Sequence, residues 1–71
     1  MEKSEAKERL IDHMTSLVVA GRRMSDTDSY AAVLIGPLDD SEVRWCFDQV
    51  KARLDFLRRV ADLFNEKHPG D

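Results

Sequence analysis

Residues 43–64 read VRWCFDQVKARLDFLRRVADLF, and an unbroken row of apolar residues runs through them. The row alternates spacings of 4 and 3 positions, and its members are Val43, Phe47, Val50, Leu54, Leu57, Ala61 and Phe64. That spacing is the heptad repeat of a helix that packs along its length against another helix. The stretch therefore predicts one long helix and indicates an all-α protein.

A capping box marks where this long helix begins. With Asp39 as the N-cap, Glu42 falls at the third helical position and can bond back to the cap. No glycine or proline interrupts the segment before His68-Pro69-Gly70. We therefore expect a helix over about 40–67.

The N-terminal segment predicts a second amphipathic helix, over about 4–22. Ser4 is the expected N-cap. Gly21 is the expected stop, because glycine readily adopts the left-handed conformation that ends many helices, although the helix can also run on to Met24. The apolar positions recur at helical spacing and are Leu10, Ile11, Met14, Leu17 and Val18.

The segment Tyr30–Ile35 fits either a short helix or a strand. Two alanines and nearby capping residues favour a helix over about 28–35 that ends at Gly36, before Pro37. No other segment resembles a partner strand, and an unpaired strand is not stable. We therefore predict a short helix here.

Together these elements predict one small helical domain over residues 1–71. Its expected architecture is a helical hairpin or three-helix unit, with two long antiparallel helices and a short helix between them. The long helix would be roughly 40 Å long, whereas a compact chain of this size has a diameter under about 30 Å. The first helix can therefore cover only part of it.

The far end of the long helix carries a second apolar line, Phe56, Val60 and Leu63. This surface is too large for one short helix, so we predict a homodimeric helical bundle. A single small core also rarely supplies more than about 3–5 kcal/mol, which favours oligomerisation. The alternative is a monomeric three-helix bundle in which the other helices cover both lines. The predicted dimer interface comprises Val43, Phe47, Val50, Leu54, Phe56, Leu57, Val60, Ala61, Leu63 and Phe64.

Side chains suited to catalysis or metal binding are few. Cys46 is the only cysteine and His13 and His68 the only histidines, so we expect no internal disulfide, metal site or cofactor. Cys46 lies past the first turn of its helix without an adjacent base, and we interpret it as a buried structural thiol. His13 borders an apolar stripe and fits a half-exposed histidine. With no carboxylate pair and no Gly-rich phosphate loop, the sequence predicts no enzyme.

Localisation is predicted from the same composition. A lone cysteine is typical of a reducing compartment, and the charged N-terminus resembles no secretory leader. No apolar run is long enough to span a bilayer. We therefore expect a cytoplasmic protein that does not enter membranes.

The formal net charge of −3 is concentrated in one segment. Residues 25–42 carry five acidic and no basic side chains, whereas residues 1–24 and 43–71 each sum to +1. These acids fit solvated turns, or an anionic, partly aromatic surface that docks into a basic groove on another protein. The predicted partner-binding residues are Asp26, Asp28, Tyr30, Leu38, Asp39, Asp40 and Glu42.

The sequence thus favours a non-enzymatic protein–protein interaction module. We expect a small cytosolic regulator or inhibitor that pairs with itself and binds another protein. Its size and charge are analogous to those of small helical proteins that phages and mobile elements encode to block host proteins. A subunit whose fold is completed in a hetero-complex is a third hypothesis.

The alternative function is a dimeric DNA-binding transcriptional regulator. DNA affinity depends on basic side chains that contact phosphates. If the last two helices formed a helix-turn-helix, however, the recognition helix would begin with Asp39-Asp40-Ser41-Glu42, whose acids repel phosphates. The charge pattern therefore argues against nucleic acid as the partner.

Overall fold

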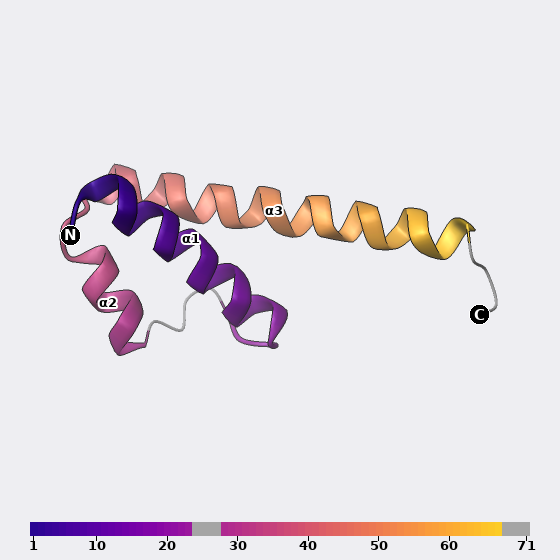
Figure 1. The fold of residues 1–71 in the computed structure, drawn as a ribbon, viewed down its shortest axis with the longest axis horizontal. Helices are drawn as coiled ribbons and strands as arrows, with labels where there is room; N and C mark the ends of the chain where they lie inside the picture. The colour runs from indigo at the N-terminus through magenta and orange to yellow at the C-terminus, as the bar shows by residue number, and fades with distance from the viewer. Residues whose placement is uncertain (24–27, 68–71) are drawn as a thin grey trace.

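The computed structural model describes residues 1–23 and 28–67, which form three α-helices (Figure 1). They are α1 (Lys3–Val19), α2 (Ser29–Ile35) and α3 (Asp40–Lys67). The described residues contain no strand, so the all-α prediction is confirmed. The molecule measures 47 × 19 × 17 Å, because α3 extends well beyond the other two helices.

α1 and α3 run in the same direction, which corrects the predicted antiparallel arrangement. Lys3 and Lys7 near the start of α1 pair with Glu42 at the start of α3. Further along both helices, Asp12 pairs with Arg53. The reason is topological: α2 leads the chain back toward the start of α1, so the third helix takes the direction of the first (Figure 1).

α1 begins and ends differently from the sequence-based expectation. Glu2, not Ser4, is the N-cap residue, and its side chain makes no capping hydrogen bond. Gly21 is the stop, with a left-handed φ of 93°. The N–H of Gly21 donates to the carbonyl of Val18, and that of Arg22 to the carbonyl of Leu17, both at 2.9 Å. These bonds form a Schellman motif, which ends α1 at Val19 rather than near residue 22.

α2 confirms the choice of a helix over a strand for Tyr30–Ile35. Asp28 is its N-cap, and the carboxylate accepts a hydrogen bond from the Ala31 N–H at 2.8 Å. The helix ends at Ile35, before Gly36 and Pro37, because proline has no N–H with which to continue it.

α3 begins with the predicted capping box. The N–H of Glu42 donates to Asp39 Oδ1 at 2.9 Å, and the N–H of Asp39 donates to Glu42 Oε1 at 3.1 Å. Two N–H groups that lack partners at a helix start are thereby satisfied. The predicted C-terminal signal, His68-Pro69-Gly70, lies outside the described residues, and α3 extends to Lys67.

The core lies where α1 and α2 pack against the first half of α3. The fully buried or nearly fully buried side chains are Ala6, Leu10, Ile11, Met14, Ala31, Leu34, Cys46 and Val50. The last α3 member of this set is Val50, so the core ends long before the helix does. None of the helices in the described part of the chain carries an apolar segment long enough to cross a membrane.

Candidate functional site

A group of large apolar side chains is exposed on the second half of α3. The exposed fractions are 65% for Phe56, 48% for Leu57, 46% for Val60, 59% for Leu63 and 62% for Phe64. With 3.6 residues per turn, positions 56, 60 and 63 form one line and positions 57 and 64 form the adjacent line. The five side chains therefore share one side of the helix, which we call the α3 apolar face.

This face is exposed because α1 is too short to reach it. The 17 residues of α1 span about 25 Å, and the 28 residues of α3 span about 42 Å. Since the two helices begin side by side, α1 ends while α3 continues (Figure 1). Every residue from 55 to 66 is exposed.

An open pocket of about 480 Å³ lies where α1 and α3 separate. Thr15 contributes from α1, and the remaining lining residues, Gln49, Ala52, Arg53, Phe56 and Leu57, come from α3. Two of them, Phe56 and Leu57, belong to the α3 apolar face. The pocket therefore continues that face toward the folded core.

The ten residues of the predicted dimer interface fall into two groups. Val50 is fully buried in its own chain, Phe47 and Leu54 pack half-buried against the same core, and Val43 is half-buried. Ala61 and the α3 apolar face are exposed. The chain's own α1 and α2 thus cover the first half of the heptad row and leave the second half uncovered.

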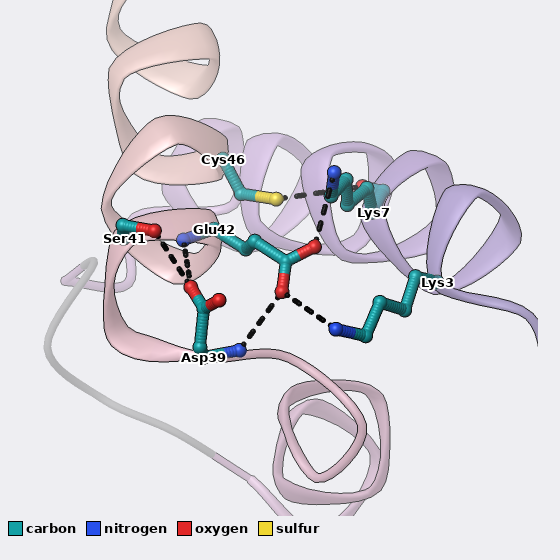
Figure 2. A network of polar contacts seen from close by, with 6 residues as sticks. All are labelled: Lys3, Lys7, Asp39, Ser41, Glu42 and Cys46. Carbon is teal, nitrogen blue, oxygen red and sulfur yellow. Dashed lines mark hydrogen bonds and ion pairs between the residues drawn. The ribbon is translucent and has the colours of Figure 1, made fainter.

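The predicted acidic surface contains carboxylates that are engaged within the chain. Glu42 Oε1 lies 3.3 Å from Lys3 Nζ, and Glu42 Oε2 lies 3.2 Å from Lys7 Nζ (Figure 2). The hydrogen bond from the Asp39 N–H and these lysines hold the pKa of Glu42 below its ordinary value. The Ser41 hydroxyl donates to Asp39 Oδ1 at 2.7 Å, and together with the Glu42 N–H it lowers the pKa of Asp39.

Asp28 is held in a second polar group, at the start of α2. Its carboxylate accepts from the Ala31 N–H and lies 2.9 Å from Nε2 of His13. The Ala31 N–H, followed by His13, lowers the pKa of Asp28. The ring of Tyr30 meets the His13 ring edge-on, with centroids 4.8 Å apart. This group docks α2 on α1, and Tyr30 stays exposed beside it.

The other residues of the predicted acidic surface take different positions. Leu38 is half-buried and packs against the core. Asp40 is exposed in the first turn of α3. Asp26 lies outside the described residues. The structure therefore brings Asp39, Asp40 and Glu42 together at one helix start, while Asp28 lies at the start of another.

Cys46 is fully buried, as expected from its position beside the heptad row. Its Sγ faces the Lys7 carbonyl oxygen at 4.0 Å (Figure 2). Burial raises the pKa of the thiol above its ordinary value, so little of the nucleophilic thiolate is present at neutral pH. Within residues 1–23 and 28–67, no three His, Cys, Asp or Glu side chains are grouped to hold a metal ion.

Sequence reasoning missed the contacts that join α1 to α3. Lys3 and Lys7 reach Glu42, and Arg53 Nη1 lies 2.5 Å from Asp12 Oδ1. The paired residues are 35 to 41 positions apart in the chain, from Lys7–Glu42 to Asp12–Arg53. The antiparallel expectation would have placed these ends far from one another. These contacts could have been predicted only if the first and third helices had been expected to run in the same direction.

Comparison with known proteins assigns the chain to no group. No protein-family model matches the sequence, and no curated protein or solved structure is detectably similar to it. Its function must therefore be argued from its own residues.

Proposed function

We propose that this chain is a non-enzymatic protein–protein interaction module whose contact surface is the α3 apolar face. The observation that carries the proposal is the exposure of five large apolar side chains on a helix that projects beyond its own core. In this view the first half of α3 builds the folded unit, and the second half binds a partner. We further propose that the protein acts in the cytosol as a small regulator or inhibitor.

The size of the exposed surface supports this proposal. A fully exposed aromatic side chain presents about 150–250 Å². On that scale the α3 apolar face exposes on the order of 500 Å², which is near the upper end for the largest apolar patch of a soluble monomer. Patches of that size commonly mark interaction sites.

The alternative contact surface, the acidic segment, is less well supported. The carboxylates of Asp28, Asp39 and Glu42 cap helices or pair with His13, Lys3 and Lys7. A carboxylate that is already bonded within the chain has less to gain from a basic partner. These carboxylates therefore stabilise helix starts and helix contacts within the chain, and the exposed apolar residues of α3 are the better candidates for binding a partner.

Charge on the projecting half of α3 also favours a protein over a nucleic acid. Arg58 and Arg59 are accompanied there by Asp55, Asp62 and Glu66, so the segment is not a basic surface. Phosphate contacts need a concentration of positive charge. The burial of Cys46 supports a function without a thiol nucleophile.

Two matched aspartate substitutions test the proposal. Val60→Asp places a charge in the α3 apolar face, whereas Val33→Asp places one on α2, where Val33 is 66% exposed and outside that face. Each tagged variant is used to capture proteins from a cell lysate together with an untagged copy of the wild-type chain. Captured proteins are identified by mass spectrometry, and helix content is checked by circular dichroism.

We expect wild type and Val33→Asp to retain the same partner, and Val60→Asp to lose it while keeping its helix content. Retention of that partner by a folded Val60→Asp variant would overturn the proposal, because the face would then not be the contact surface. Failure of the wild-type chain to retain any protein, its own second copy included, would overturn it as well.

A further inference from the structure

We propose that a second copy of this chain covers the α3 apolar face, with the two α3 helices antiparallel and a two-fold axis at Val60. This inference deepens the proposed function, on which it rests, by naming the partner. It has two supports, which are the order of residues in the face and the area available.

The residues of the face are arranged symmetrically about Val60. Residues 56–64 read FLRRVADLF, so a phenylalanine lies four positions before and after Val60, and a leucine lies three positions before and after it. On the helix, positions 56 and 64 lie about 40° to either side of Val60, and positions 57 and 63 about 60°. The face therefore looks nearly the same when the helix direction is reversed.

In a two-fold interface the same patch of both copies meets, so residues that lie level with one another must fit. When two such helices cross at Val60 in opposite directions, Phe56 of each copy lies level with Phe64 of the other. Leu57 is then level with Leu63 of the other copy. The pocket beside Phe56 continues the apolar surface at this level, so it can accept the second copy's Phe64.

The exposed area is sufficient for a pair. Two copies of the face bury on the order of 1,000 Å², which is the size at which an interface becomes specific rather than incidental. The antiparallel direction also places the two folded cores at opposite ends of the shared helices. Neither core then blocks the approach of the other chain.

The oligomeric state is tested by sedimentation equilibrium of the full chain at micromolar concentrations. We expect twice the chain mass of 8.2 kDa for wild type and for Val33→Asp. Val60→Asp should raise the dissociation constant on the order of 100-fold or more, because it buries two facing carboxylates. A monomeric wild-type chain, or a Val60→Asp variant that still dimerises, overturns the inference.

The direction is tested by disulfide formation in a Cys46→Ala background. Val60→Cys lies at the axis and should cross-link to itself. Phe56→Cys and Phe64→Cys should cross-link to each other when mixed but not separately, since disulfides need Cα atoms within about 7 Å. Self-cross-linking of the separate Phe56→Cys and Phe64→Cys variants would indicate a parallel pair and overturn the inference.

These outcomes separate the inference from the proposed function. A monomeric wild-type chain that captures another protein through Val60 would retain the proposed function and remove the second copy as the occupant. If the Val60→Asp variant captures the same proteins as wild type, both the proposed function and the second copy as partner are rejected.

Discussion

Lys7 on α1 and Glu42 on α3 form an ion pair with 3.2 Å between Nζ and Oε2. The same glutamate completes the capping box with Asp39, so one side chain both starts α3 and fixes it beside the start of α1 (Figure 2). Exposed ion pairs contribute little to stability. Their effect here is positional: with the two helices aligned at their starts, the excess length of α3 projects at the other end.

The capping carboxylates predict a loss of stability in acid. The pKa values of Asp28, Asp39 and Glu42 lie below their ordinary values of 3.8, 3.8 and 4.5 in the folded chain. As the pH falls, the unfolded chain therefore takes up protons first. The contribution of these three carboxylates to the free energy of unfolding should be complete above about pH 5.5 and should be lost as the pH falls through the lowered values.

Asp39→Asn provides the control for this pH dependence. Asparagine is as good an N-cap as aspartate but does not titrate. Denaturant unfolding of this variant between about pH 3 and 7 should show a shallower acid loss than wild type. An identical pH profile for the two proteins would contradict the role assigned to Asp39. Asp39→Ala, which removes the acceptor, should lower Tm at neutral pH.

Much of the local structure was predictable because its signals lie within a few residues of one another. Asp39 and Glu42 are three positions apart, and that spacing alone predicts the capping box. Gly21 marked the end of α1 for a similar reason. The predicted N-cap at Ser4 was wrong. A serine favours the N-cap position but does not fix it, and α1 begins after Glu2 even though the Glu2 side chain makes no capping hydrogen bond.

The relative placement of the helices was not predictable in the same way. The heptad row is apolar from Val43 to Phe64, and nothing in that repeat distinguishes Val50, which is buried, from Leu57, which is exposed. The difference arises from where α1 ends, and therefore from the direction of packing. The acidic segment was similarly ambiguous, because charge in a sequence does not reveal that Glu42 meets Lys3 and Lys7.

Alanine substitutions at the two glycines Gly21 and Gly36 should have different effects on stability. Gly21 has a φ of 93°, which an L-residue disfavours, so Gly21→Ala should cost roughly 1–2 kcal/mol. Gly36 lies in the right-handed helical region, and an added Cβ would meet the Val33 carbonyl oxygen at 3.4 Å, an ordinary contact. Pro37 follows, however, and proline disfavours this conformation for a preceding residue with a Cβ. Gly36→Ala should therefore change the free energy of unfolding by less than about 1 kcal/mol, and by less than Gly21→Ala does. Thermal unfolding of the two variants measures the difference, and equal Tm values would be inconsistent with the Schellman motif at Gly21.

Alanine substitutions at Leu34 and Val33 should show how much α2 contributes to the stability of the core. Leu34 is fully buried, and Leu34→Ala should cost about 2–5 kcal/mol. Val33, one position earlier, is exposed, and Val33→Ala should change the free energy of unfolding by no more than about 0.5 kcal/mol. Urea unfolding of both variants checks this contrast. Similar losses at the two positions would mean that α2 packs through a different face.

The Cys46 thiol should react with a thiol reagent only when the fold opens and exposes it. Because the side chain is buried and its pKa is raised, an aromatic disulfide reagent at pH 7 should modify it at least about 100-fold more slowly than in denaturant. Asp48→Cys in a Cys46→Ala chain is the control, since position 48 is exposed on the same helix. Rapid labelling of native Cys46 would show that the contact between α1 and α3 opens readily.

The shared starting end of α1 and α3 has a practical consequence for handling the protein. Residues before Lys3 lie at the core end of the molecule, far from the α3 apolar face (Figure 1). A tag or surface linker attached at the N-terminus therefore leaves that face accessible. A tag attached after residue 71 would be only a few residues from Lys67, where α3 ends, and would obstruct access to the face. Immobilisation through the N-terminus is the orientation in which binding to this protein should be measured.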